Sequence, residues 1–523
     1  MRFITALIFL STFFCLSPAF ANNLAITNVS LADQDTTGNT YDIEFDTAWD
    51  NSWRIAAAPA AAANWDAAWV FAKFRKWSSG AWGNWTHCTL LNSGSVTPAG
   101  STITLDSTGG VYKGAFIYRD ATGTGSNSFA NAQLRWDYGT DGVADADKVE
   151  VRVFGIEMVH IPAGAFYIGD VDGDQAGNFK WQDATAGAPQ ITSSLGNAVN
   201  TVDNDYDDTQ LEGSGIRIDG DGGLDTDASG AVDNASFPTG YNAYYVMKYE
   251  ITQGQYVQFL NTLTATQQGN RWATGNFNSF RYFIKKATNG LFGVDADDDA
   301  GTDNSSALYS LMNESADGAD VACNWLSWMD VAAYADWAAL RPMTELEFEK
   351  AARGQQTAVD DEYAWGNTTI ETATTSLSNG GAANETPNQG NLNYSSSTPD
   401  GPYRVGSFAD GSSTRTNSGA GYYGALELSG SLWERTVTVG NSTGRAFAGT
   451  AGDGSLSAAG HATNSDWPGY SAGQVTGASG SGFRGGAWYG GTSGAVVSDR
   501  FYAAYADAGR GSDDGGRLAR TSP

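Results

Sequence analysis

The chain has 523 residues and a formal net charge of −29, from 58 acidic and 29 basic residues. A field of that sign repels phosphate backbones, so the composition argues against a nucleic-acid partner. The length exceeds what one hydrophobic core normally organises and predicts more than one domain.

The first 21 residues have the layout of a secretory signal peptide. Arg2 supplies the positive start, an apolar run extends from Phe3 to Leu16, and small residues end the stretch at Ala21. The run is short for a bilayer span, and no later stretch is apolar enough to cross a membrane. We therefore expect an exported bacterial protein, cleaved at about Ala21 and located in the periplasm, at the cell surface or in the medium.

Cysteine and histidine spacing argues against two common kinds of stabilising site. After cleavage only Cys88 and Cys323 remain, in different predicted domains, so a disulfide framework is not expected. His87, His160 and His461 are far apart in the chain, and their spacing indicates no zinc or iron site built on histidine.

Residues 22–154 are predicted to form an all-β domain. Its short segments carry alternating or β-branched and aromatic residues, separated by Gly, Asp, Ser and Asn. This pattern is typical of a sandwich of immunoglobulin-like size. The segments are LAITNVSL, TYDIEFDTAW, AAWVFAKFRKW, GVYKGAFIYR, AQLRWDYG and KVEVRVFGI.

A second unit occupies residues 155–523 and contains acidic insertions at about 170–237 and 295–318. The first insertion includes DVDGD and DGDGGLDTD, which resemble the opening of a calcium loop. Neither has a glutamate at the expected twelfth position, so a solvated acidic insertion is the alternative. The same alternatives apply to DADDDAGTD in the second insertion.

Three helices are predicted in the second unit, each beginning with a capping box in which a hydroxyl residue is followed three positions later by Gln, Asp or Glu. Their sequences are ITQGQYVQFLNTL, SWMDVAAYADWAAL and TELEFEKAARG. Apolar residues recur at helical spacing, which favours core packing over a cofactor site. The capping pairs are Thr252 with Gln255, Ser327 with Asp330, and Thr344 with Glu347.

Six motifs in a fixed order resemble the formylglycine-generating enzyme family, also called sulfatase-modifying factor domains. They are MVHIPAGAFYIG, YYVMKYEITQGQYVQFLN, CNWLSWMDVAAYADWAALRPMTELEFEKAARG, YAWGN, YGALELSGSLWERT and FRGGAWY. The resemblance implies an α+β fold, the family's variant of the C-type lectin fold, following the β-sandwich. It also implies that calcium is a cofactor to expect.

The enzymes of this family carry two cysteines just after a K/R-G-G-S-[WY] turn, where the thiolates bind copper(I) and activate oxygen. Here the turn is Arg484 to Trp488, and the cysteine positions fall at about Gly490 and Ala495. Copper is therefore not expected, and no catalytic residue is assigned. A related iron-dependent branch takes its metal ligands from a histidine-bearing helical domain, which this sequence does not show. Whether the chain is an enzyme stays open, and the missing cysteines argue against it.

The resemblance also implies two calcium sites, one in GNLNYSSSTPDGP and one in GSLWER. Ser431 and Arg435 depart from the family pattern at the second site, where Glu434 pairing with an arginine such as Arg435 is the alternative. Hard oxygen ligands of this kind suit calcium. The implied ligands are the side chains of Asn391, Asp400 and Glu434 and the carbonyl groups of Leu392 and Pro402.

The segment Tyr489–Asp514 resembles the variable region that diversity-generating retroelements mutagenise at adenines. Its frame reads R-G-G-x-W, S-D-R and G-G-R, and the segment contains no Lys, Glu, Gln, Met or Trp, which that mutagenesis does not produce. An ordinary family C-terminus is the alternative.

Chemically the segment favours ligand binding, because Tyr and Phe offer large contact areas and Ser, Thr and Asp offer adaptable polar groups. We expect an unknown protein or glycan as partner. The alternatives are a formylglycine-generating-type oxidoreductase with unrecognised chemistry and a structural surface or matrix protein. The predicted ligand-binding residues are Tyr489, Thr492, Ser493, Phe501, Tyr502, Tyr505, Asp507, Ser512, Asp513 and Asp514.

Overall fold

The computed structural model describes residues 23–57, 62–171, 178–181, 187–194, 202–203, 216–218, 234–288, 290–296, 317–371, 376–387, 389–394 and 399–523. The predicted signal peptide and the DGDGGLDTD stretch lie outside the described residues. The same holds for most of both acidic insertions, so whether they bind calcium or are solvated insertions stays open.

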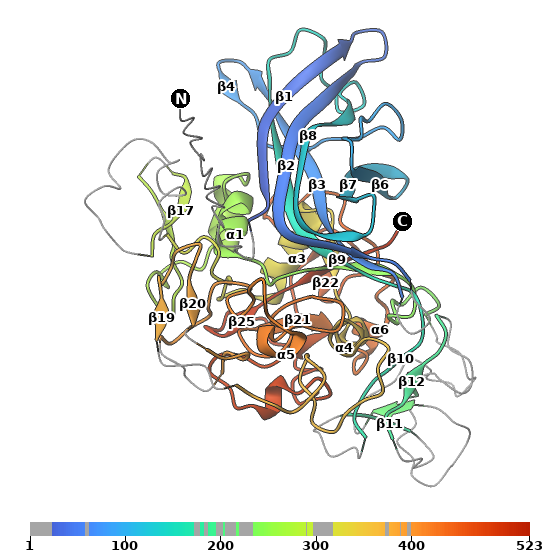
Figure 1. The fold of residues 1–523 in the computed structure, drawn as a ribbon. Coiled ribbons are helices and arrows are strands. Elements are labelled where there is room, and N and C mark those ends of the chain that lie inside the picture. The colour runs from blue at the N-terminus through green and yellow to red at the C-terminus, as the bar shows by residue number, and fades with distance from the viewer. Residues whose placement is uncertain are drawn as a thin grey trace, which may run out of the picture.

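The N-terminal strands rise from the top of the molecule in Figure 1. All six segments predicted from alternation are strands, and β6, which has the same alternation, was not predicted. The strands are β1 (Ala25–Asp35), β2 (Thr40–Ile55), β3 (Asn64–Ser78), β4 (Ala81–Trp82), β5 (Thr86–His87), β6 (Ser101–Thr108), β7 (Val111–Arg119), β8 (Gly123–Asp137) and β9 (Val149–Ile161).

These strands form two groups with one apolar cluster between them. Strand β2 pairs with β1 and β8 in the first group, and β6, β7, β3 and β9 make the second group. A short pairing of β2 with β3 at Arg54 and Ile55 joins both groups into one sheet. Side chains from both groups, including Phe45, Val70 and Leu134, are buried in the shared cluster. The opposite face of β3 is also buried, because Trp69 and Phe71 belong to the core of the C-terminal part. This double burial explains why β3 reads as a nearly continuous apolar run rather than a strict alternation.

Strand β9 connects the two parts of the chain in a single sheet. It pairs with β3 from Val149 to Val159 and with β15 (Tyr244–Met247) from Met158 to Ile161. Strand β15 pairs in turn with β26 (Leu518–Thr521), and β26 pairs with β18 (Arg341–Pro342). The domain boundary expected between residues 154 and 155 therefore lies inside a strand.

The remaining strands are short and belong to small sheets around the helices. They are β10 (Phe166–Tyr167), β11 (Phe179–Trp181), β12 (Gln190–Ile191), β13 (Val202–Asp203), β14 (Ile216–Ile218), β16 (Ile284–Lys286), β17 (Phe292–Val294), β19 (Leu377–Ser378), β20 (Thr386–Pro387), β21 (Trp433–Val437), β22 (Tyr470–Ser471), β23 (Gln474–Val475), β24 (Ser481–Arg484) and β25 (Asp514–Gly515).

The three predicted helices are confirmed, and each has the predicted capping box. Helix α2 was missed, although Thr264 and Gln267 form a fourth capping box at its start. The helices are α1 (Gln253–Leu260), α2 (Ala265–Arg271), α3 (Trp328–Trp337), α4 (Glu345–Arg353), α5 (Arg415–Ser418) and α6 (Ser442–Arg445), with a 3-10 turn, η1, at Ser493–Ala495. None of the helices in the described ranges combines the length and apolarity that crossing a bilayer requires.

Buried contacts join the N-terminal strands to the helices. The Trp69 indole donates to the carbonyl oxygen of Ala338 at 2.9 Å, just beyond α3. Phe71 meets Trp337 edge-on, with ring centroids 5.1 Å apart. The Arg520 guanidinium lies 4.5 Å from the Trp69 ring centroid. The two parts thus share a core as well as a sheet.

Candidate ligand-binding site

A three-stranded sheet, in the order β24-β21-β25, is the base of the site. Arg435 on β21 pairs with Phe483 on β24, and Trp433 pairs with Asp514 on β25. Because side chains alternate along a strand and paired residues share a face, these four side chains occupy one face of the sheet. Three segments distant in sequence thereby contribute to one surface.

The opposite face of this sheet carries buried charges. Arg484 binds Glu345 on α4 at 3.0 Å, and Arg500 binds the same carboxylate at 2.6 Å. Both arginines lower the pKa of Glu345, although burial alone would raise it. Arg517 pairs with Glu434 at 2.8 Å. All five side chains are buried, so these arginines hold the loops in place and do not contact solvent.

The turn after Arg484 and the loop after Arg500 depend on glycines. Gly485 and Gly486 have φ of 92° and 73°, the left-handed region that favours glycine. Gly482 lies directly beneath the loop, where an added Cβ would overlap the carbonyl oxygen of Ala503. The Phe483 amide then donates to the Tyr502 carbonyl oxygen at 3.0 Å. These contacts hold the loop at a fixed distance from β24.

Arg435 fixes the other end of the loop. Its guanidinium donates to the carbonyl oxygens of Asp507 at 2.7 Å and Gly509 at 2.9 Å. It also pairs with the Asp514 carboxylate at 2.8 Å. One buried arginine thus connects the loop to the sheet, at the position where the resembling enzymes carry a tryptophan.

A cavity of about 250 Å³ lies between the sheet and the loop. Five of its lining residues were predicted from the sequence: Tyr502, Tyr505, Asp507, Asp513 and Asp514. Trp433 and Phe483 complete the lining and were missed. Both lie in family motifs, where a large apolar residue next to buried positions is normally assigned to the core. Only the pairing of β21 with β24 places them in the cavity wall.

The other predicted residues lie outside the cavity lining. Tyr489 and Phe501 are exposed, at 67% and 66% of their surface. Phe501 contacts Tyr502 at its edge, with centroids 4.7 Å apart, and so extends the aromatic surface. Thr492 and Ser493 lie at η1, and the Ser512 carbonyl oxygen accepts from the Trp488 indole at 3.2 Å.

Two carboxylates in the cavity have shifted pKa values. Burial raises the pKa of Asp514 to about 6, against the opposing effect of Arg435. Burial also raises the pKa of Asp513. Asp514 is therefore mostly ionised above neutral pH.

The cysteine positions of the resembling enzymes hold no reactive group here. Gly490 is half-buried after the glycine turn, and Ala495 packs in an apolar cluster with Trp365 and Leu392. Cys88 and Cys323 are free and buried, and burial raises the pKa of both thiols well above the ordinary value. A thiol held protonated in this way is a poor nucleophile and metal ligand.

Two of the groups implied as calcium ligands in the segment from Asn391 to Pro402 have other partners. The Asn391 side-chain oxygen accepts from the Glu371 amide at 2.9 Å, and the Pro402 carbonyl oxygen accepts from Arg281 at 2.8 Å. Leu392 is buried and Asp400 is exposed. Among the described residues, no three His, Cys, Asp or Glu side chains are grouped so that they could hold a metal ion.

Glu434 does not fit a calcium ion as it stands, because both carboxylate oxygens face the Arg517 guanidinium at 2.9 and 3.1 Å. The alternative expected from the sequence was an ion pair with an arginine such as Arg435. Such an ion pair is present, but the arginine is Arg517, and Arg435 pairs with Asp514 instead.

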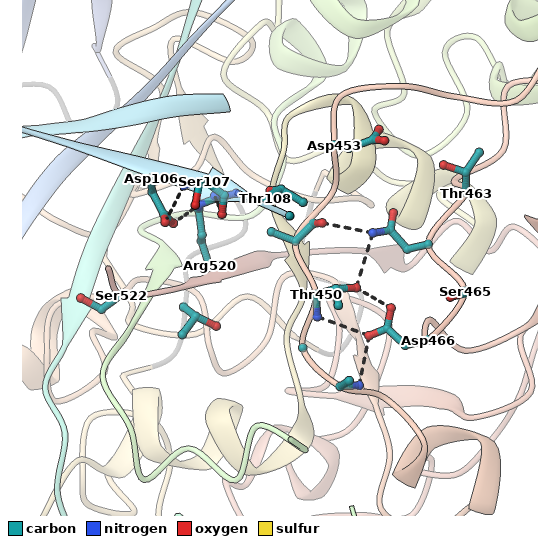
Figure 2. A pocket seen from close by; sticks show the side chains of 16 residues that line it. Asp106, Ser107, Thr108, Thr450, Asp453, Thr463, Ser465, Asp466, Arg520 and Ser522 are labelled. Atoms are coloured by element: carbon teal, nitrogen blue, oxygen red, sulfur yellow. Dashed lines mark hydrogen bonds and ion pairs between the residues drawn. The ribbon is translucent and has the colours of Figure 1, made fainter. Parts of the chain in front are cut away.

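A larger cavity, of about 800 Å³, lies where β6 meets the C-terminal strand, and Figure 2 shows its lining. Arg520 pairs with Asp106, and Asp466 accepts from the Thr450 amide at 3.3 Å. No aromatic side chain lines it. Many of its polar groups bind one another, so we regard it as a gap between the two parts of the chain and not as the main site.

The fold and the site define an α+β domain in which the glycine turn of a formylglycine-generating-type oxidase is retained without its cysteines. The family model described as "Sulfatase-modifying factor enzyme 1-like domain" matches residues 145–522, and the chain belongs to this family. The C-type lectin-like fold is characteristic of the family. A comparison with the curated proteins finds no match.

Proposed function

We propose that the protein is an exported, ligand-binding member of the sulfatase-modifying factor family. In this proposal an immunoglobulin-like sandwich precedes a lectin-fold domain, and the surface around the 250 Å³ cavity binds a protein or a glycan. The observation that carries it is the exposure of the predicted aromatic side chains. Tyr502 and Tyr505 line the cavity, and 39% and 58% of their surface is exposed. Folding alone gives no reason for this exposure.

Exposed aromatic residues beside adaptable polar groups are typical of binding surfaces, since Tyr contributes large contact area and loses little rotamer freedom. The buried arginines support the same proposal, because they hold the loop without occupying the surface. The absence of cysteine at positions 490 and 495 argues against the oxidase alternative.

Replacing both Tyr502 and Tyr505 by alanine is expected to weaken partner binding by about 2–4 kcal/mol, because aromatic hot spots carry most of the energy of an interface. Binding would be measured on a glycan array and against purified candidate surface proteins, with each hit titrated by surface plasmon resonance. Unfolding curves of the double variant should stay close to those of the wild type, since both side chains are substantially exposed, at 39% and 58%.

Trp77→Ala is the matched control. Trp77 is an exposed aromatic residue, at 39%, but it lies on β3 and does not line the cavity. Its binding should equal that of the wild type. Unchanged binding of the Tyr502/Tyr505 variant to every confirmed partner would instead favour a structural surface or matrix protein.

The oxidoreductase alternative has its own test. Copper(I) binding, together with oxidation of a cysteine-containing peptide, would support unrecognised enzyme chemistry. Diversification of the segment Tyr489–Asp514 is a further part of the proposal, and neighbouring DNA tests it. A near-identical repeat that differs only at adenines, beside a reverse transcriptase gene, supports diversification, and a locus without them rejects it.

A structural calcium ion also remains a proposal for the segment from Asn391 to Pro402. A chelator is then expected to lower the melting temperature, and added calcium to restore it, because removal of a ligand that binds only the folded state destabilises that state. Asp400→Asn should abolish the response, since it removes a carboxylate that is exposed and available. An identical melting curve with and without chelator would reject the ion.

A further inference from the structure

The cavity has an unbroken aromatic wall. Trp433 contacts Tyr502, with centroids 5.4 Å apart, and Tyr502 contacts Tyr505 at 5.7 Å. The ring centroids of Tyr505 and Phe483 are 6.5 Å apart, and those of Phe483 and Trp433 are 6.4 Å apart. Each of the four rings thus touches two others in a closed circuit. Three of the four contacts are edge-on or strongly tilted, at 83°, 60° and 70°, so the rings turn different faces and edges toward the space that they enclose.

The remaining lining residues are acidic. Asp507, Asp513 and Asp514 are present, and the lining contains no Lys, Arg or His. Arg435 is fully buried behind the wall, 4.4 Å from the Phe483 ring centroid. The Arg435 guanidinium already donates hydrogen bonds to the loop and to Asp514. Three carboxylates against one guanidinium leave the cavity with a negative potential.

Aromatic faces carry negative charge density, and a cation enclosed by several of them is attracted to each ring. The carboxylates add a Coulomb attraction that a neutral ligand does not experience. A volume of about 250 Å³ is below the usual range for drug-sized ligands, so the cavity suits a single compact group. An anionic ligand would meet repulsion from both the rings and the carboxylates.

We propose that the cavity formed by Trp433, Phe483, Tyr502 and Tyr505 binds an alkylammonium group. The inference rests on the proposed ligand-binding function and adds the chemical class of the ligand. The group is carried either by a small molecule with a quaternary ammonium or by a lysine side chain. In both cases the rings surround the cation, and Asp507 and Asp513 supply the counter-charge.

The test compares probes by ligand-observed NMR titration of the full chain at pH 7.5. The probes are choline, its neutral carbon isostere 3,3-dimethyl-1-butanol, and N-acetyl-lysine methylamide. We expect at least one cationic probe to bind about tenfold more tightly than the neutral isostere, which is the contribution of a cation enclosed by aromatic rings. Preference for choline identifies a quaternary ammonium source, and preference for the lysine derivative identifies a side-chain source.

Two single variants make the test independent of one substitution. Tyr505→Ala, at an exposed ring, should weaken the cationic probe about tenfold, and Asp513→Asn should weaken it several-fold while leaving the neutral isostere unchanged. Trp77→Ala should leave all three titrations unchanged.

The outcomes separate this inference from the proposed function. Equal binding of the cationic and neutral probes overturns the cation preference, as does binding of neither cation. In both cases the ligand-binding function still stands if the Tyr502/Tyr505 double variant loses a confirmed glycan or protein partner. Tight cation binding that is unchanged in Tyr505→Ala and Asp513→Asn also overturns the inference, because the cation would then bind elsewhere.

Discussion

Glu345→Gln is expected to lower the free energy of unfolding by about 3–5 kcal/mol at pH 7, the usual cost of removing one partner from a buried ion pair. Glu345 accepts from Arg500 at 2.6 and 3.0 Å and from Arg484 at 3.0 Å. It also accepts from the Val439 amide at 2.8 Å. The amide would leave two buried guanidinium groups with insufficient negative charge. Urea unfolding followed by tryptophan fluorescence measures the difference.

The pH dependence of this difference has a definite sign. Arg500 and Arg484 hold the folded-state pKa of Glu345 below its ordinary value of 4.5. The stabilisation is therefore complete above that value and is lost as the pH falls through the lowered folded-state pKa. Wild type and Glu345→Gln should consequently converge in stability at acid pH. A constant difference from pH 7 down to pH 3 would contradict this interpretation.

Glu150→Gln provides a control at another arginine–glutamate ion pair, one that is partly exposed to solvent. Glu150 pairs with Arg75 at 2.5 Å, but the two side chains are 31% and 24% exposed. Solvent screens such a pair, so its loss should cost about 1 kcal/mol or less. An equally large effect at Glu150 would mean that burial is not the cause of the Glu345 effect.

Gly482→Ala is the second large effect that we expect. The added methyl group would overlap the backbone carbonyl of Ala503, which cannot rotate away as a side chain would. Either the loop that carries Tyr502 and Tyr505 is displaced or β24 shifts. We expect a loss of about 1–3 kcal/mol in stability, as for other overpacking substitutions, together with weaker binding of the partner. Unfolding curves and the binding titrations measure the two effects.

Gly269→Ala is the corresponding control. Gly269 lies in α2, its Cβ would meet no heavy atom within 4 Å, and its φ is not positive. Alanine there should stabilise the helix by about 0.5–1 kcal/mol, because glycine loses more backbone freedom on folding. If Gly482→Ala binds the partner as tightly as the wild type does, the observed position of the loop above β24 is not required for binding.

Local signals allowed the helices to be predicted from the sequence, and distant pairing limited the prediction of the site. A capping box such as Thr344 with Glu347 lies within one turn, so it can be read directly from adjacent residues. Thr264 and Gln267 form the same capping box at the start of α2, a helix that was not predicted. Exposure of Tyr505 was also foreseeable, since it lies among glycine and polar residues rather than in an apolar period.

The cavity wall could not be derived in this way. Trp433 and Asp514 become neighbours only through the parallel pairing of β21 with β25. Phe483 joins them through a second, antiparallel pairing. Neither register leaves a trace in the local sequence. Which arginine pairs with Glu434 could not be derived from the sequence either, because Arg435 is adjacent in sequence but points to the opposite face of the strand.

The unbroken sheet from β3 through β9 and β15 to β26 has a mechanical consequence. A ligand that pulls on the loop around Tyr502 transmits its load to β24, and through the shared core to the sheet. The load then crosses many backbone hydrogen bonds between β3 and β9, which share it along eleven paired positions from Asp66 to Lys76. A flexible linker would let the binding surface swing under such a load. Here the shared sheet and core join the N-terminal strands to the part that carries the aromatic surface, so a pull on either part is expected to move both as one body.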